Sequence, residues 1–337
     1  LEMRKAYLKG ERIETVYFGG GTPSQLEEED FKQIFGTLQA CYGMEHCYEI
    51  TLEANPDDLS VPYMQMLSTL PFNRISMGIQ TFDDATLTLL KRRHNARTAI
   101  EAVGRCRQAG FDNISIDLIY GLPGETKERW ENDLRQAIDL QVEHISAYHL
   151  IYEEDTPIYS MLKQHQVCEV DEESSLEFFT LLIEQLQKAG FEQYEISNFC
   201  RPGKHSRHNT SYWKGIPYLG CGASAHSFDG TTREWNVSSI DLYIIGIEEN
   251  RRAFEIEHLD PTTRYNEFII TTMRTAWGTP LEQLKKTFGK ERWEYCLNMA
   301  APYLQSGKLE ERNGALCLTR EGIFVSDSIM SDLLWVD

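Results

Sequence analysis

The sequence predicts an α/β protein built on a parallel sheet, followed by a small winged-helix-like α+β domain. In the first half of the chain, short apolar runs alternate with amphipathic stretches and recur about every 30 to 40 residues, as expected of βαβ units. From about residue 261 the pattern changes to helices followed by a hairpin that turns at Asn313-Gly314. We therefore predict two domains, residues 1–260 and residues 261–337.

The first domain is predicted from five strands and the helices between them. The strands are expected at 15–19, 48–53, 74–79, 113–120 and 144–150, and the helices at 26–38, 62–69, 84–91, 98–109 and 127–140. Several strands look apolar on both faces, which predicts a sheet covered on both sides. Residues 1–8 look helical and precede the first visible strand, so we expect a further strand upstream of Leu1 that would cover a bare sheet edge.

The second half begins with a predicted helix at 172–189 that leads into 194–199. Residues 200–222 have no regular pattern and are rich in glycine, proline, histidine and aromatic residues, which favours a functional segment over disorder. The last domain is expected to contain helices at 264–276, 280–288, 291–306 and 320–334, and strands at 309–312 and 315–319.

The composition excludes several classes of partner. The chain has 337 residues, with 33 Lys and Arg against 52 Asp and Glu, and a formal net charge of −19. Because nucleic-acid binding needs basic side chains to neutralise phosphates, no nucleic-acid partner is expected. No apolar run reaches the roughly 18 residues of a membrane span. The eight cysteines are widely spread, and without a visible secretory signal they indicate reduced thiols and a cytoplasmic location.

Glycines and polar residues follow the ends of the predicted strands. Gly19-Gly20-Gly21-Thr22-Pro23 follows the first strand, where successive backbone amides can hold a small charged group or simply make a tight turn. Glu53 ends the second strand and Gln80 follows the third. Such positions point into the mouth of a βα barrel, the usual place of function, although a solvated loop acid would fit Glu53 equally well.

Two further charged groups lie near these strand ends. Arg92 and Arg93 follow Gln80, and an arginine there can clamp a carboxylate with two hydrogen bonds; a solvated helix face is the structural alternative. Asp117 lies inside the apolar fourth strand, where a carboxylate costs free energy unless a structural partner or a ligand pairs with it.

The strings YFGGGTPS, LEANPD, SMGIQTF and DLIYGLPGET occur in this order at suitable spacing. Together they resemble the oxygen-independent coproporphyrinogen III oxidase superfamily of radical S-adenosylmethionine (SAM) proteins, from about residue 15 to the C-terminus. The resemblance implies a partial parallel βα barrel that is open on one side, with SAM as a cofactor.

The same resemblance implies a role for each matching residue. Gly20 and Gly21 hold the amino group of SAM, and Thr22 belongs to the same turn. The polar groups of SAM are held by Glu53 and Gln80, its carboxylate by Arg92, and its ribose and adenine lie near Asp117 and Ile119. Arg92 rather than Arg93 is chosen from its spacing after Gln80.

Members of this superfamily hold a 4Fe-4S cluster with a CxxxCxxC loop, and none of the eight cysteines of this chain has that spacing. The cluster supplies the electron that cleaves SAM, so the printed residues alone are not expected to perform radical chemistry. We expect the cluster-binding cysteines upstream of Leu1; a natural remnant without them is the alternative.

One motif of the irregular segment indicates the branch of the superfamily. His208-Asn209-x-x-Tyr212-Trp213 looks like the HNxxYW motif of the heme-chaperone branch, HemW. A neutral imidazole is a good axial ligand for heme iron, so His208 is the expected iron ligand, and Tyr212 and Trp213 can flank a porphyrin face. From residue type alone, a capped loop histidine and a core tryptophan fit as well.

Three functions follow as expectations. The first is a heme chaperone that binds heme and transfers it to acceptor proteins, on a scaffold for SAM and a 4Fe-4S cluster, with oxidase activity not its main role. The second is an oxygen-independent coproporphyrinogen III oxidase, a radical SAM enzyme of porphyrin biosynthesis. The third is a cluster-free barrel that binds a nucleotide or phosphate at GGGTP.

Overall fold

The structure is a computed structural model that describes residues 1–336. The chain forms two compact units. The barrel unit contains residues 14–34 and 47–206, and the second unit contains residues 1–13, 35–46 and 207 onward. Helix α1 (Glu28–Tyr42) contributes residues to both.

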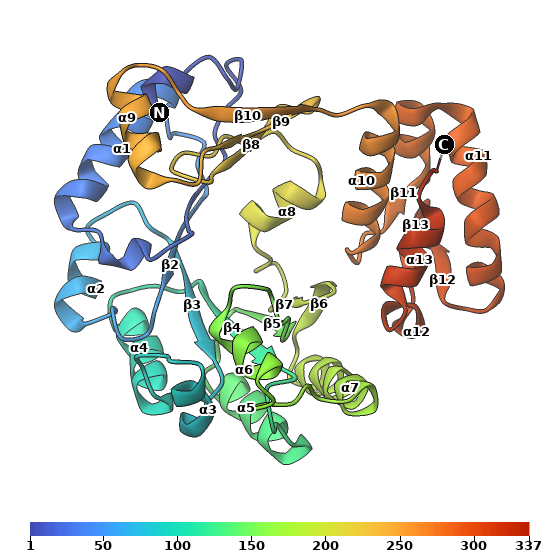
Figure 1. The fold of residues 1–337 in the computed structure, drawn as a ribbon, viewed down its shortest axis with the longest axis horizontal. Helices are drawn as coiled ribbons and strands as arrows, with labels where there is room; N and C mark the ends of the chain where they lie inside the picture. Colours follow the sequence, from blue (N-terminus) through green and yellow to red (C-terminus); the bar gives the residue numbers. More distant parts are fainter. Residues whose placement is uncertain (337) are drawn as a thin grey trace. The chain divides into compact units, whose positions relative to one another are not determined.

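The barrel unit is built on a seven-stranded sheet in the order β1-β2-β3-β4-β5-β7-β6. Its strands are β1 (Thr15–Phe18), β2 (Glu49–Ala54), β3 (Arg74–Gln80), β4 (Ile114–Tyr120), β5 (His144–His149), β6 (Glu192–Glu195) and β7 (Asn198–Cys200). Neighbours from β1 to β5 are parallel, whereas β7 runs antiparallel to both β5 and β6. The strands wind into an open half-barrel (Figure 1), which confirms the expected partial barrel and adds an antiparallel hairpin at its end.

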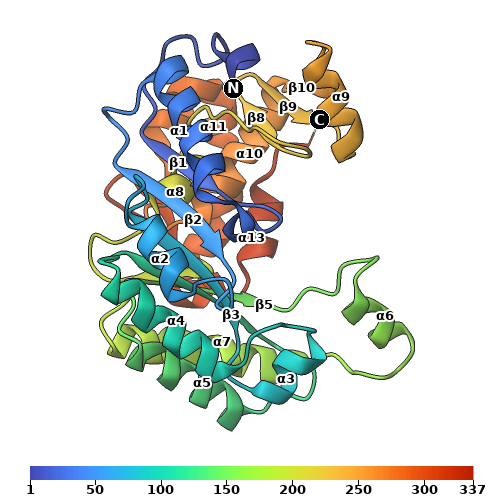
Figure 2. The same cartoon turned by 90° about the vertical axis from the view of Figure 1, so that its left-hand side faces the viewer.

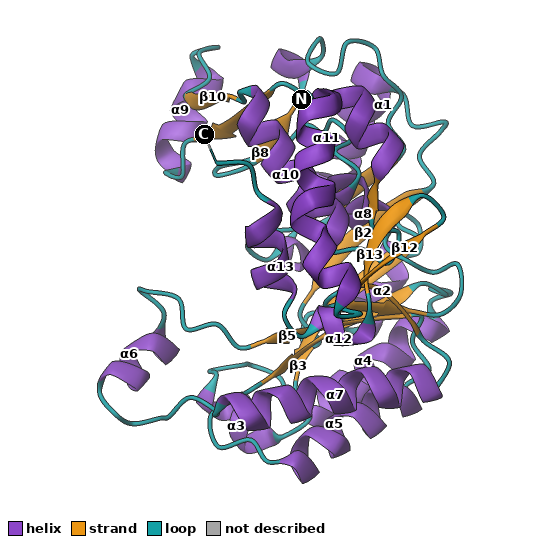
Figure 3. Cartoon of the chain, turned by 90° about the vertical axis from the view of Figure 1, so that its right-hand side faces the viewer, coloured by secondary structure: helices purple, strands orange, loops and turns teal. Residues whose placement is uncertain are grey.

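Most helices of the barrel unit gather on one side of the sheet. The helices of this unit are α2 (Val61–Leu67), α3 (Asp84–Leu89), α4 (Ala96–Gln108), α5 (Lys127–Asp139), α6 (Pro157–Lys163) and α7 (Glu172–Lys188), with the short 3-10 helix η2 (Pro23–Gln25). Figure 3 shows α3, α4, α5 and α7 together below the strands. Helix α6, which the sequence did not predict, projects away from the sheet (Figure 2) and buries none of its residues.

The two faces of the sheet differ in polarity. On the helix-covered face, Ile75, Met77 and Ile116 are fully buried. The expectation that several strands are apolar on both faces is wrong, because alternate residues of the same strands are polar. The polar face is nevertheless covered as well, since Thr51, Ser115 and His144 are buried. The polar face carries Tyr17, Glu49, Thr51, Glu53, Arg74, Ser76, Ser115, Asp117, His144 and Ser146.

The second unit contains a small three-stranded sheet. Strands β8 (His226–Phe228), β9 (Thr232–Asn236) and β10 (Phe254–His258) are antiparallel in the order β10-β9-β8, and α9 (Ile240–Glu248) connects β9 to β10. The segment predicted as irregular contains a helix, α8 (Arg207–Trp213). The expected N-terminal helix is shorter than predicted, since only η1 (Glu2–Arg4) forms, and Arg4 pairs with Glu234 of β9 at 2.5 Å.

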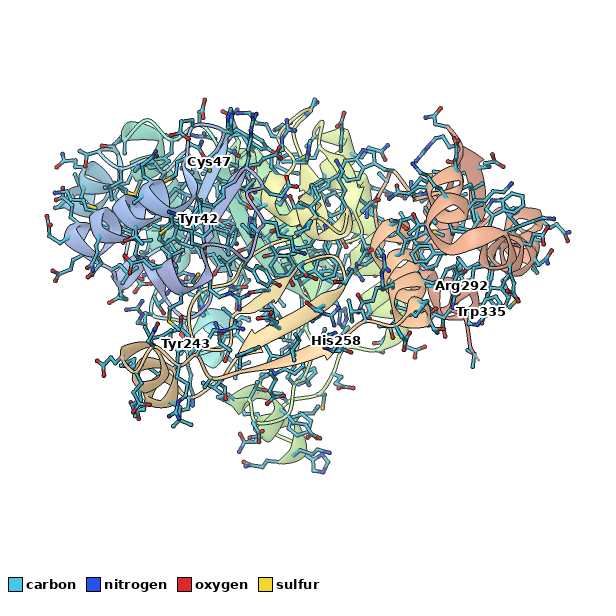
Figure 4. All side chains as sticks on the ribbon, turned by 90° about the horizontal axis from the view of Figure 1, so that it is seen from above. Tyr42, Cys47, Tyr243, His258, Arg292 and Trp335 are labelled. Carbon is cyan, nitrogen blue, oxygen red and sulfur yellow. The ribbon has the colours of Figure 1, made fainter. Side chains whose placement is uncertain are left out.

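The C-terminal part of this unit has its own hydrophobic core. It contains α10 (Pro261–Met273), β11 (Thr279–Pro280), α11 (Leu281–Gln305), β12 (Leu309–Arg312), β13 (Ala315–Leu318), α12 (Arg320–Ile323) and α13 (Ser326–Leu333). Gly289 has φ 86° and breaks α11, which matches the predicted gap between two helices. The core residues lie between Tyr265 and Leu333, and the Arg292 guanidinium lies 5.4 Å from the centre of the Trp335 ring (Figure 4).

Candidate functional site

The glycine turn after β1 and the carboxylate at the end of β2 form one part of the site. Gly20 and Gly21 have φ of 76° and 63°, in the left-handed region that glycine adopts without strain. A Cβ added at either would meet nothing within 4 Å, so the turn faces open space. Glu53 accepts the Gly20 N–H at 3.0 Å and the Tyr17 hydroxyl at 2.6 Å. Thr22 is the N-cap residue of the short helix η2.

Arg92 and Gln80 meet above Gly78 on β3. The Arg92 Nη2 donates to the Gly78 carbonyl at 3.0 Å and to Asn55 Oδ1 at 2.8 Å. A Cβ added at Gly78 would lie 2.8 Å from Gln80 Nε2 and 3.4 Å from Arg92 Nη2. Because Gly78 has no side chain, the amide and the guanidinium can both approach the strand there.

Arg92 and its neighbour Arg93 have different kinds of partner. Arg93 pairs with Asp57 at 3.1 Å and with Asp58 at 3.0 Å, so its charge is already compensated. No ion pair to Arg92 occurs within residues 1–336, and its partners are the neutral oxygens of Asn55 and Gly78. Burial lowers the pKa of Arg92, as expected of a guanidinium without a carboxylate in direct contact. Of the two, Arg92 is therefore the arginine able to bind an added carboxylate.

Asp117 lies on β4, on the polar face of the sheet. Its register neighbours are Gly78 on β3 and Ser146 on β5, and the Ser76 hydroxyl donates to Asp117 Oδ2 at 3.5 Å. Burial raises the pKa of Asp117 to about 6, with the charge of Glu53 adding to the effect. Ile119 follows two residues later on the same face and is half-buried.

Asp117→Asn is expected to raise the free energy of unfolding at pH 8 by about 3 kcal/mol. The folded-state pKa of about 6 exceeds the usual 3.8, so the wild-type protein loses stability as pH rises between these values. Asparagine carries no charge, so the gain in unfolding free energy over the wild-type protein is complete above about pH 7. It vanishes below about pH 4, where Asp117 is protonated in both the folded and the unfolded state. Urea unfolding of both proteins at pH 4 and pH 8 measures it; an equal difference at the two pH values would contradict the raised pKa.

Helix α8 of the second unit carries the HNxxYW residues. His208 and Tyr212 are four residues apart and share one helix face, where His208 Nε2 and the Tyr212 hydroxyl are 2.9 Å apart. Asn209 and Trp213 have the same spacing on the adjacent face. Burial lowers the pKa of His208 to about 4, so the imidazole is neutral at pH 7.

Basic and aromatic groups surround the end of α8. The guanidinium of Arg274 lies 5.5 Å from the centre of the Trp213 ring, and the Lys214 ammonium lies 5.4 Å from that of Trp277. The indole nitrogen of Trp213 is buried without a hydrogen-bond partner among the described residues. Helix α8 therefore has a neutral imidazole near its start and aromatic rings and cations near its end.

Some neighbours of the predicted set were not predicted. Tyr17 holds Glu53, and Asn55 holds Arg92. Both lie inside strings already singled out, YFGGG and LEANPD, so their place next to Gly19 and Glu53 was an available signal. The SAM set and the HNxxYW set lie in different compact units.

Within residues 1–336, no group of three or more His, Cys, Asp or Glu side chains could hold a metal ion, and all eight cysteines are free thiols. The described residues therefore offer no ligand set for an iron–sulfur cluster, and cluster ligands upstream of Leu1 stay a prediction. In the same part of the chain, no helix is both long and apolar enough to span a bilayer.

Two family models match the sequence. Residues 1–137 match the radical SAM superfamily, and residues 259–325 match the HemN C-terminal domain. Among solved structures, coproporphyrinogen III oxidase (HemN) from Escherichia coli, described as a radical SAM enzyme, superposes with a TM-score of 0.81. That alignment covers 98% of this chain and 81% of the other at 19% identity, so it shows a shared fold.

Curated relatives are more similar in sequence. The heme chaperone HemW of Bacillus subtilis (strain 168) is 31% identical over 324 residues, which cover 96% of this chain and 86% of the relative. The protein of the same name from Lactococcus lactis is 33% identical, over 82% of this chain and 73% of the relative. That from Mycobacterium tuberculosis is 31% identical, over 99% and 84%.

Proposed function

Because the chain belongs to the heme chaperone HemW family of radical SAM proteins, we propose that it binds heme and transfers it to acceptor proteins. The observation that carries this proposal is the geometry of α8. A histidine with its pKa lowered to about 4 keeps a nitrogen lone pair at neutral pH, as an axial ligand of heme iron requires. We also propose a cytoplasmic location, which the eight free thiols support.

Each of the residues around His208 can contribute to heme binding. The Tyr212 hydroxyl, 2.9 Å from Nε2, orients the imidazole and sets which ring nitrogen is bare. Trp213 offers a flat apolar surface to a porphyrin, and Asn209 lies beside it on the helix. Arg274, which already lies near Trp213, can pair with a heme propionate.

His208→Ala is expected to weaken hemin binding about tenfold or more, since a lost axial ligand removes the main iron contact. Titration of the protein with hemin, followed by the Soret band, should saturate near one heme per chain. His258→Ala is the matched control, because His258 is exposed on β10 and lies outside α8. The proposed heme site would be wrong if the Soret band of the wild-type protein showed no saturable change. It would also be wrong if His208→Ala bound hemin as tightly as the wild-type protein.

The strand-end residues are proposed to bind SAM. Gly20, Gly21 and Thr22 line the open turn for its amino end, and Glu53 and Gln80 take its polar groups. Arg92 binds the carboxylate of the methionine part, while Asp117 and Ile119 lie near the ribose and adenine. SAM supplies the sulfonium whose carbon–sulfur bond radical SAM proteins cleave. The open space before the turn and the lack of an ion pair to Arg92 among the described residues support this assignment.

The two other functions find less support. A phosphate bound at GGGTP would meet the Glu53 carboxylate, which already accepts the Gly20 N–H at 3.0 Å, and like charges repel. Coproporphyrinogen III carries four carboxylates, but the polar face of the sheet offers Glu49, Glu53 and Asp117 against Arg74 and the nearby Arg92. The chaperone function is therefore preferred to the oxidase.

Residues 261–337 are proposed to form a separate small domain after a barrel domain of residues 1–260. The hydrophobic core between Tyr265 and Leu333 supports this division, because all its members come from the C-terminal segment. The match of the HemN C-terminal domain at 259–325 points to a similar boundary.

A further inference from the structure

The turn after β3 contains a strained residue. Gln80 has φ of 71°, which a side chain other than glycine adopts only at a cost. The Thr81 N–H donates to the Ile79 carbonyl at 3.0 Å, so Gln80 is the middle residue of a three-residue turn of the rare, strained kind. The pairing of β3 with β4 also slips between Gly78 and Gln80. Strained residues of this kind persist when surrounding contacts hold them.

A buried carboxylate holds the residues after the turn. Asp133, on α5, is 2% exposed and accepts the Thr81 hydroxyl at 2.5 Å and the Phe82 N–H at 3.0 Å. The Thr81 oxygen in turn accepts the Asp83 N–H at 3.1 Å. Asp83 is the N-cap of α3, the helix that precedes Arg92. One carboxylate thereby fastens both the turn and the start of the segment that carries Arg92.

A buried histidine holds the residue before the turn. His94 is 5% exposed, and its Nε2 lies 3.1 Å from the Ile79 carbonyl. A carbonyl oxygen only accepts, so Nε2 carries the proton and donates it to this bond. His94 thus holds Ile79 and Asp133 holds Thr81, and Gln80 lies between these two residues.

We propose that Asp133 and His94 are positioning residues that hold the strained turn at Gln80 and so place its side-chain amide beside Arg92 for SAM. This inference rests on the proposed SAM site. Neither residue belongs to that site: both contact the strand end through its backbone or through Thr81. Their effect on SAM is therefore exerted through the position of Gln80, whose Nε2 lies above Gly78.

Asp133→Ala is expected to raise the dissociation constant of SAM about tenfold, and Asp133→Asn, which can still accept the Phe82 N–H, by less. Isothermal titration of the purified full chain with SAM measures both. Glu143→Ala is the matched control. The Glu143 carboxylate also binds a strand backbone, accepting the Ile114 N–H at 2.8 Å and Arg107 at 2.7 Å, but at the opposite end of β4. It is expected to change SAM affinity less than about twofold.

Equal loss of SAM affinity in Asp133→Ala and Glu143→Ala, or no loss in either, would overturn the positioning role, because both variants remove a carboxylate that accepts a strand-end backbone N–H. If Asp133→Ala does not fold, Thr81→Val removes the hydroxyl that donates to Asp133, and His94→Leu removes the donor to the Ile79 carbonyl, both with smaller changes in volume. They are expected to weaken SAM binding in the same direction, and unchanged affinity in both would also overturn the role.

A second measurement separates this inference from the SAM assignment. Gln80→Gly should raise the melting temperature of the wild-type protein, because glycine relieves the positive φ. The rise should be smaller in Asp133→Ala, where the turn has already relaxed. An equal rise in both backgrounds would refute the positioning role of Asp133. A wild-type protein that binds no SAM would instead refute the proposed cofactor site, while the melting data still decide whether Asp133 holds the turn at Gln80.

Discussion

Gly19→Ala is expected to abolish measurable SAM binding, with the dissociation constant raised by about a hundredfold or more. A Cβ at this position would overlap the Tyr17 ring and lie 2.9 Å from Cδ and Oε1 of Glu53. Both side chains would have to move, and the Glu53 bond to the Gly20 N–H would be lost with them. Titration with SAM at matched protein concentrations measures the change.

Gly104→Ala is the control for this substitution. Gly104 lies within α4, and a Cβ there would meet nothing within 4 Å. Alanine should stabilise that helix by about 0.5–1 kcal/mol and leave SAM affinity unchanged. Wild-type SAM affinity in Gly19→Ala would show that neither the turn nor Glu53 takes part in binding.

Gly322→Ala is expected to destabilise the C-terminal segment by about 3 kcal/mol or more. A Cβ on Gly322 would overlap the Lys308 carbonyl oxygen and lie 2.9 Å from its carbon. That carbonyl already accepts the Thr319 N–H at 3.0 Å, so it has little freedom to withdraw. Urea unfolding followed by tryptophan fluorescence should report the loss, because Trp293 and Trp335 pack against this core.

Gly314→Ala separates crowding from backbone strain in the same segment. Gly314 has φ of 76° in the hairpin turn, yet a Cβ there would meet nothing within 4 Å. Only the left-handed conformation then opposes alanine, at a cost of roughly 1–2 kcal/mol. If both variants lost the same stability, the close approach of Gly322 to Lys308 would not be the cause of its effect.

The alternation of strands and helices was predictable because it rests on local signals. β-branched apolar runs bounded by glycine or polar residues give strands β1 to β5 within about two residues of their observed ends, whereas β8, β9 and β10 were not predicted. The polarity of the sheet was harder to predict. Serines and threonines alternate with isoleucine and methionine in strands such as Arg74–Gln80, and only the register shows that they line up on one face. Helix α8 escaped prediction because seven residues including Asn, Thr and Ser carry a weak helix signal.

The candidate site also contains some residues that were predictable from the sequence and others that were not. Gly20, Glu53 and Gln80 lie at or beside the C-terminal ends of β1, β2 and β3, and parallel strands bring these ends to one edge, so their grouping follows from the fold class. Asp133 could not be predicted because its partner Thr81 is 52 positions away and it lies on the helix side of the sheet. Such a residue acts through the backbone of another element and leaves no pattern near the motif that it supports.

The one-sided helix layer has an evolutionary consequence. Neighbouring positions of one strand are under different selective pressures. Ile75 and Met77 maintain the packed interior, while Ser76 and Gly78 lie on the polar face. Exchanges at the second kind of position leave the hydrophobic packing intact, so new binding preferences can be explored at little risk to folding. Every second residue of a strand lies on the polar face. Substitutions at these alternate positions can therefore give the scaffold new chemistry while its architecture is kept.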